Sequence, residues 1–353
     1  MEFRLSDKSL LPALVALLLL GSCVSLAVGA MTIGWRDVLA GLIHWSWPGF
    51  LELDVPEQYA LVLGEIRLPR LVMGLMVGGT LGLCGAVMQG LFRNPLADPG
   101  IIGVSAGAGV GAAFVLVFAS GAALTTFAGG IFKDLQWFLL PLAASLGGAL
   151  STWLVYRLGD RGKSVVMMLL AGVAINALAG AAIGLLNYVA DDRALRDITL
   201  WQMGTLGGAT WGTVAVSALV LMIGGALLWR RAPALNALLL GESEARHLGV
   251  DVVRLKQLMI VLTAIAMGAA VSAAGMIGFI GLVVPHTIRL LRGPDHRYLL
   301  PYSVLAGGLL LVLADTVART LVAPAEMPVG IITALLGAPF FIYLLWQQRQ
   351  QIF

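Results

Sequence analysis

The sequence predicts an all-α integral membrane protein with ten transmembrane helices in a single domain, residues 1–353. Hydrophobic residues make up 59% of the chain and charged residues 12%, which is about half the charged share of a typical soluble domain. The mean hydropathy is +0.94. The alternating ten-residue pattern of a membrane β-barrel is missing, and open sheet edges are not tolerated in hydrocarbon, so the membrane-spanning segments must be helices.

Long nonpolar runs without charge supply these helices, since a bilayer-crossing helix needs about 20 apolar residues. The runs cover residues 10–35, 71–92, 100–132, 135–156, 164–190, 198–229, 257–288, 298–314 and 327–348. The run 257–288 is too long for one ordinary pass, and Gly275 and Gly278 lie near its middle. Small residues suit a tight reversal, so this run predicts two helices joined by a very short turn.

The distribution of Lys and Arg predicts the orientation, because cytoplasmic loops retain positive charge. With the N-terminus inside, most of the 22 Lys and Arg residues fall on the cytoplasmic side. The outer side keeps Arg36, Arg67, Arg70, Lys133, Arg193, Arg196 and Arg319. Ten helices then place both termini in the cytoplasm. The net charge of +3 reflects this bias, and nucleic acid is not expected as a partner.

The first run has features of a signal peptide, including a lipoprotein-like Leu-Gly-Ser-Cys box that ends at Cys23. The nonpolar run nevertheless continues past Cys23 to full membrane-spanning length, which favours a retained first helix over cleavage.

Several patterns that mark enzymes or cofactor sites are incomplete. The Gly-Lys-Ser end of a phosphate loop occurs at residues 162–164, but Arg157 stands where its first glycine belongs. The two cysteines, Cys23 and Cys84, offer no disulfide framework, and the four histidines lack the i, i+4 pairing of metal ligands. We therefore predict no catalytic residues, no metal and no permanently bound cofactor.

Two features suggest close packing and a cytoplasmic contact. Glycines recur at i, i+4 and i+8, which lets helix backbones approach closely. These glycines are Gly74, Gly78 and Gly82, then Gly103, Gly107 and Gly111. The longest inner loop, about residues 230–256, holds two short helical patterns, with Gly241 between them, Gly249 at their end and Ser243 as a plausible N-cap. This charged knob is either a solvated loop or a handle for a cytoplasmic partner.

Six sequence blocks carry a family resemblance. They are Arg-Leu-Pro-Arg at 67–70, the block 85–100 that contains Arg-Asn-Pro-Leu-Ala-Asp-Pro-Gly, and the blocks 240–249, 278–286, 314–319 and 328–339. In order and over nearly the whole chain, they resemble the permeases of ABC importers for iron-siderophores, haem and vitamin B12 (type II importers).

The resemblance implies a homodimer in the bacterial inner membrane, with an inverted repeat of helices 2–5 and 7–10. A weak internal sequence similarity, between Arg93-Asn94-Pro95 and Arg292-Gly293-Pro294, does not support this repeat. It would instead pair helices 2 and 3 with helices 8 and 9 in parallel. Two ATPase subunits on the cytoplasmic side would use the ATP, and a periplasmic substrate-binding protein would deliver the cargo. The function is therefore expected to be transport, with ATP hydrolysis on a separate subunit.

The same resemblance implies three sets of site residues. The ATPase-coupling set is Gly241, Glu242, Glu244, Ala245, Arg246 and Gly249. Arg67, Arg70 and Arg319 would pair with glutamates of the binding protein, although arginines that snorkel at the membrane interface would show the same pattern. The translocation path and gate set is Ser164, Val165, Ala171, Arg193, Arg196, Trp201 and Met203, and helix packing accounts equally well for the small residues around Ala171.

The prediction of the cargo depends on the segment 191–204, where Leu-Arg-Asp is followed by Trp-Gln-Met-Gly. This pattern is most similar to the haem-transporting branch. Arg193 and Arg196 would either attract haem propionates at the outer mouth or only cap and solvate a surface helix. A ferric siderophore or cobalamin is the alternative. An ion-coupled secondary transporter would need acidic residues within its helices, and Asp315, near a predicted helix end, is the single candidate. A scaffold without transport activity would leave the knob unexplained.

Overall fold

The computed structural model describes residues 7–29, 31–46, 56–118, 131–159 and 164–352. Over these residues the protein is helical and has no strand, which confirms the all-α prediction. The helices are α1 (Asp7–Ala27), α2 (Trp35–Ser46), α3 (Glu57–Leu61), π-helical η1 (Val62–Arg67), α4 (Leu68–Leu91), 3-10 helix η2 (Pro99–Ile102), α5 (Val104–Phe118), α7 (Ile131–Leu158), α8 (Val165–Val189), α9 (Asp192–Gln202), α10 (Trp211–Trp229), α11 (Ala232–Leu239), α12 (Glu242–His247), α13 (Val252–Ala274), α14 (Ile280–Arg292), α15 (His296–Leu321) and α16 (Val329–Ile352).

Within the described residues, eight helical segments are long and apolar enough to cross a membrane. They are Ser9–Ala27, Glu57–Leu91, Leu139–Leu158, Val166–Val189, Trp211–Trp229, Val252–Ala274, His296–Leu321 and Val329–Trp346. Helix α5 is apolar but shorter, and α14 has 13 residues. The predicted count of ten full spans therefore stays a prediction.

Two boundaries decide how the predicted runs compare with the structure. The run 257–288 divides as predicted, because α13 ends at Ala274 and Gly275 follows with a φ of +71°. The second predicted helix, expected to begin at residue 71, is longer than predicted. Its helical backbone starts at Glu57 and continues through η1 into α4, so Arg67 and Arg70 lie within a continuous helix rather than at its outer end.

The predicted glycine stripes do bring backbones together. A Cβ added at Gly78 would overlap the carbonyl oxygen of Gly307, so α4 and α15 touch backbone to backbone. A Cβ added at Gly107 would overlap the carbonyl oxygen of Gly147, and α5 meets α7 in the same way. This confirms the packing interpretation of the two stripes.

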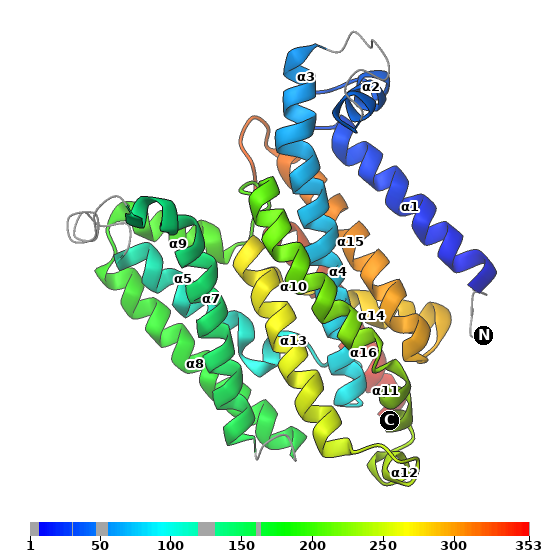
Figure 1. Ribbon diagram of the computed structural model, residues 1–353. Helices are drawn as coiled ribbons and strands as arrows, with labels where there is room; N and C mark the ends of the chain where they lie inside the picture. Colours follow the sequence, from blue (N-terminus) through cyan, green and yellow to red (C-terminus); the bar gives the residue numbers. More distant parts are fainter. Residues whose placement is uncertain (1–6, 30, 47–55, 119–130, 160–163, 353) are drawn as a thin grey trace.

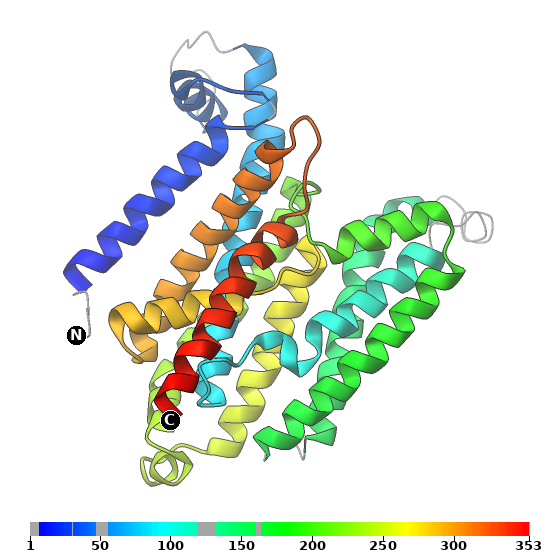
Figure 2. The same cartoon turned by 180° about the vertical axis from the view of Figure 1, so that it is seen from behind.

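The helices form a bundle around α4, which contacts α10, α13, α14 and α15 and is largely buried (Figure 1). Figure 1 shows α2 and α3 at one end of the molecule and α11 and α12 at the opposite end. Helix α9 lies crosswise, against α5 and α8 (Figure 2). The predicted cytoplasmic knob and the predicted outer arginines therefore lie at opposite ends of the bundle.

Candidate functional site

The knob consists of α11 and α12, joined by Gly241. Gly241 has a φ of +124° and Gly249 a φ of +83°, conformations that favour glycine and explain both positions. The prediction of Ser243 as N-cap is wrong. Gly241 occupies the N-cap position without a side-chain cap, because α12 starts at Glu242 and takes Ser243 into its first turn.

The coupling residues separate into buried and exposed groups. Ala245 is fully buried and packs in the main hydrophobic core, which holds α12 against the bundle. Glu242 accepts a hydrogen bond from Lys256 of α13 at 2.6 Å, and the Lys256 side chain is only 7% exposed. Glu244 and Arg246 are exposed. Glu242 is therefore already engaged within the chain, by Lys256 and by a looser ion pair with Arg246 at 3.9 Å. The exposed charges of α12 that can still meet a partner are those of Glu244 and Arg246.

Two leucines beside these charges were missed by the sequence reasoning. Leu240 is 66% exposed and Leu248 is 63% exposed, one at each end of α12. Charged side chains flanked by exposed leucines are typical of a contact surface, which favours the handle interpretation of the knob over a solvated loop.

At the opposite end of the bundle, Arg70 joins two carboxylates. Its Nε and Nη2 atoms donate to Asp315 of α15 at 2.9–3.1 Å, and its Nη1 atom donates to both carboxylate oxygens of Glu326 at 2.9 and 3.0 Å. Asp315 is buried, whereas the Glu326 side chain is 51% exposed and lies in the connection between α15 and α16. Sequence reasoning missed Glu326, which no local motif marks.

The other two arginines of this outer charge cluster tie α1 to the bundle. Arg67 donates to the carbonyl oxygens of Leu26 and Met31. Arg319 donates to the carbonyl oxygen of Ser25 and to its hydroxyl at 2.8 Å, and its Nε lies 3.7 Å from Asp315. Arg67, Arg70 and Arg319 are each at most 7% exposed. The structure thus brings the predicted docking arginines together and gives each a partner within the chain.

This cluster bears on the alternative of ion-coupled transport. Asp315 was the one acidic candidate, and two arginines hold it as their counter-ion. A carboxylate paired in this way is a structural charge, so the described geometry does not favour an ion-binding role.

The predicted path residues do not form one site in the single chain. The Ser164 hydroxyl accepts from the backbone N–H of Met167 and so caps α8, and Val165 begins that helix. The side chain of Val165 lies outside the described ones. Ala171 is 8% exposed in the single chain, and its place in the path stays a prediction. Helix α8 exposes large apolar residues, among them Leu170 and Val173.

The remaining path residues lie on or just after α9, beyond the far end of α8. Arg193 and Arg196 are exposed, Trp201 is half-buried, and Met203 is 38% exposed. The carbonyl oxygen of Met203 accepts from the backbone N–H of Gly330 at 3.1 Å, which joins this region to α16. These residues sit at the other end of α8 from Ser164, as a path from one side to the other requires.

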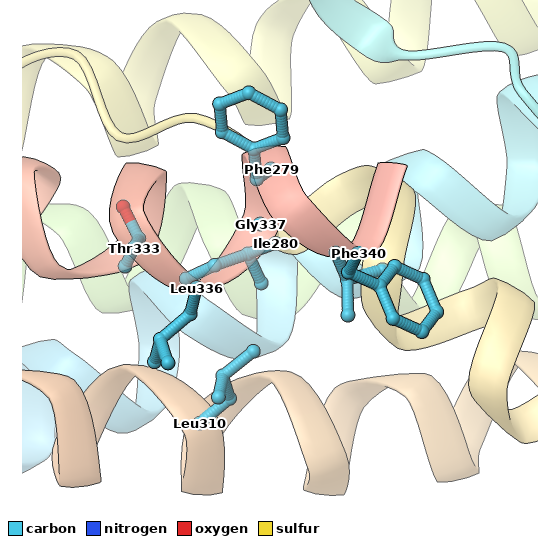
Figure 3. A pocket seen from close by; sticks show the side chains of 8 residues that line it. Phe279, Ile280, Leu310, Thr333, Leu336, Gly337 and Phe340 are labelled. Atoms are coloured by element: carbon cyan, nitrogen blue, oxygen red, sulfur yellow. The ribbon is translucent and has the colours of Figure 1, made fainter. Parts of the chain in front are cut away.

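A small apolar cavity of about 100 Å³ lies between α14, α15 and α16 (Figure 3). Its lining residues are Phe279, Ile280, Val283, Leu310, Thr333, Leu336, Gly337 and Phe340. The hydroxyl of Thr333 is its one side-chain polar group and donates to the carbonyl oxygen of Gly330 at 3.1 Å. Pockets for drug-sized ligands have roughly 300–1,000 Å³, so this cavity is too small for haem or cobalamin.

Comparison with known proteins decides the family. Residues 17–347 match the FecCD transport family. The chain belongs to this family. This FecCD protein is 41% identical over 354 residues to the hemin transport system permease protein HmuU of Yersinia pestis, and the match covers 99% of each chain. It is 44% identical over 315 residues to the cobalamin import system permease protein BtuC of Halobacterium salinarum, covering 87% of this chain and 81% of that one.

Solved structures agree with this assignment. A metal-chelate type ABC transporter in an inward-facing conformation superposes with a TM-score of 0.81 at 31% identity, over 97% of this chain and all of that one. PsaBC from Streptococcus pneumoniae shares the fold, with a TM-score of 0.53 at 16% identity, over 87% of this chain and 94% of that one. The FecCD protein is therefore a multi-pass membrane permease of an ABC importer, a class that works with an ATPase and a substrate-binding protein.

Proposed function

We propose that this FecCD protein is the haem-translocating subunit of a bacterial ATP-driven importer. The observation that carries the proposal is the 41% identity to a hemin transport permease over 99% of both chains. The exposed Arg193 and Arg196 on α9 add support, because guanidinium groups pair well with the propionates of haem. Cobalamin is the second candidate, since the cobalamin permease of H. salinarum is 44% identical over 315 residues.

The translocation path is proposed to form between two copies of the chain. The apolar cavity between α14, α15 and α16 is far too small for the cargo and does not supply a path through one subunit. Helix α8 exposes a row of apolar side chains that suit either a partner helix or a large, partly hydrophobic cargo. Ser164 and Val165, where α8 begins, are proposed as the cytoplasmic gate of that path.

The proposed orientation assigns a side of the membrane to each end of the bundle. The knob of α11 and α12 is proposed to face the cytoplasm, with both chain termini on the same side, and to seat against an ATPase subunit. The outer charge cluster is proposed to face the periplasm, where the binding protein docks. The inner membrane of a bacterium is the proposed location.

Uptake into liposomes tests the function and its cargo. The permease, co-purified with its ATPase, is reconstituted and supplied with the binding protein loaded with haem or with cobalamin. We expect haem uptake that requires ATP, together with a Soret band in the binding protein as purified. Uptake of cobalamin alone would select the second candidate. Uptake that follows an ion gradient without ATP would contradict the importer mechanism.

The exposed charges of α12 provide a prediction for ATPase contact. Glu244→Arg or Arg246→Glu is expected to reduce ATPase co-purification about tenfold or more, because charge reversal in an interface costs affinity. Pull-down of the tagged permease, with the ATPase quantified on gels, measures the effect.

Arg254→Glu is the matched control for these charge reversals. Arg254 is an exposed arginine at the same end of the bundle, and it pairs with the nearby Asp251. The control should retain the ATPase. Retention of the ATPase by all three variants would contradict the proposed contact.

A further inference from the structure

A hydrogen-bonded clasp connects the knob to the first turn of α15. The side-chain amide of Asn236 on α11 donates to Asp295 at 2.6 Å, and its carbonyl oxygen accepts from the backbone N–H of His296 at 2.8 Å. The Nδ1 atom of His296 lies 2.9 Å from the same carbonyl oxygen. Asp295 also caps α15 by accepting from the backbone N–H of Arg297. One asparagine therefore bonds both to the residue that caps α15 and to the first residue of that helix.

The bonding pattern determines the state of each partner. Because Asp295 accepts from the Asn236 amide nitrogen, the amide oxygen must face His296, and Nδ1 must carry the hydrogen that it donates. Burial disfavours the charge of Asp295, but hydrogen bonds from the Arg297 backbone and the Asn236 side chain outweigh it, so the pKa of this carboxyl lies below its ordinary value. The clasp thus joins an ionised carboxylate, an amide and an imidazole in one consistent arrangement.

His296 extends the clasp to a third helix. Its side chain is fully buried, and its Nε2 atom has no hydrogen-bond partner. That atom lies directly against Gly90 of α4, where a Cβ would overlap it. The imidazole is therefore wedged between α11 and α4, and a displacement of α11 must act on it.

Besides the buried Ala245, two side-chain hydrogen-bonded anchors hold the knob to the bundle, and they lead to different helices. Glu242 of α12 holds Lys256 of α13, whereas Asn236 of α11 holds the start of α15. Helix α15 then contacts the backbone of α4 along its length, at Gly307 among other positions, and carries Asp315 at its far end. A rigid helix that is fastened at its first turn moves as a body when that turn is displaced.

We infer that Asn236 is a positioning residue. During the import cycle, Asn236 passes a displacement of the knob on to α15. The inference rests on the proposed function, because it needs an ATPase that moves the knob. Asn236 touches no cargo in this scheme. It acts through Asp295 and His296, and the expected consequence of breaking it is hydrolysis of ATP without matching transport.

A pair of substitutions tests the clasp by exchanging its charges. Asn236→Asp sets two carboxylates against each other where the bond now measures 2.6 Å, so the contact must open. Adding Asp295→Asn restores one amide and one carboxylate in exchanged positions. One Asp295 oxygen now accepts from both the Asn236 amide and the Arg297 N–H, so the new amide must turn its nitrogen toward residue 236 and its oxygen toward the Arg297 N–H to restore the bond and the cap. Asn94→Asp is the matched control, an identical change at an exposed position.

The measurement is the number of cargo molecules imported per ATP hydrolysed in proteoliposomes. Asn236→Asp is expected to lower this ratio about fivefold or more, while ATPase co-purification and basal hydrolysis stay near the parental values. The doubly substituted protein should recover the ratio, and Asn94→Asp should keep it. A parental ratio in Asn236→Asp, or a double variant no better than the single one, would overturn the inference.

A second readout does not depend on cargo. Amide hydrogen exchange of residues 295–300, measured on the permease alone, is expected to rise in Asn236→Asp and to return in the double variant. Unchanged exchange in the single variant also overturns the inference. The unmodified complex is assayed first with haem and with cobalamin. If the proposed function is wrong, the unmodified complex itself fails to import haem. If the inference about Asn236 is wrong, the unmodified complex transports its cargo and the variants do not differ from it as expected.

Discussion

Asp315→Ala is expected to destabilise the protein by about 3–5 kcal/mol, because removing one partner of a buried ion pair leaves an uncompensated charge. Asp315 is 3% exposed and is the counter-ion of Arg70 and Arg319, which are themselves buried. Thermal unfolding of the detergent-purified permease, followed by light scattering and tryptophan fluorescence, should show a large fall in the midpoint.

Glu326→Ala is the matched control for that prediction. Glu326 bonds to the same arginine, at the same distance of 2.9 Å, but its side chain is 51% exposed. Exposed ion pairs contribute about 0–1 kcal/mol, so this variant should unfold near the parental midpoint. Equal midpoints for Asp315→Ala and Glu326→Ala would show that burial does not decide the strength of these contacts.

Gly85→Leu is expected to prevent correct packing of α4 against α14. A Cβ at this position would fall on the carbonyl oxygen of Gly281, so even the single methyl of Gly85→Ala forces the two backbones apart. Overpacking of a tight core costs typically 1–3 kcal/mol and sometimes more, and a leucine adds three further carbons. Size-exclusion chromatography in detergent should show a loss of monodisperse protein for leucine and a lowered unfolding midpoint for alanine.

Gly224→Ala provides the comparison at a buried position of α10. A Cβ there would lie 3.6 Å from the Cβ of Ala266, which is an ordinary contact. Alanine has about 1 kcal/mol better helix propensity than glycine, so this variant should be as stable as the parent or slightly more stable. A destabilised Gly224→Ala beside an unaffected Gly85→Ala would contradict the packing described for α4.

The parts of the fold that the sequence predicted are those with local signals. Nonpolar runs located the spans, and the i, i+4 glycine spacing located the close helix contacts at Gly78 and Gly107. The break at Gly275 was also predicted, because a glycine in a run too long for one pass marks a turn. Helix ends were predicted less well. The second predicted helix begins earlier than residue 71, because Arg70 is neutralised by Asp315 and Arg67 donates to backbone carbonyl oxygens inside the bundle.

The contacts within the candidate sites could not be predicted, because they join residues that lie far apart in the sequence. Arg70 bonds to residues 245 and 256 positions away in the chain, and Lys256 reaches Glu242 across 14 positions. Such pairings depend on how the helices are arranged, which no local pattern encodes. The sequence therefore indicated which charges matter, whereas the structure showed that Glu242 and the three outer arginines already have partners within the chain.

The double engagement of Arg70 has a consequence for docking. Its Nη1 atom is held by Glu326, a half-exposed carboxylate in a surface connection. In the proposed docking, a glutamate of the binding protein would take that place, so one carboxylate would be exchanged for another and the arginine would keep a counter-ion throughout. Docking then resembles ligand exchange at an occupied coordination site, with little net change in charge pairing. An association of this kind is readily reversible, which suits a delivery protein that must leave after every cycle.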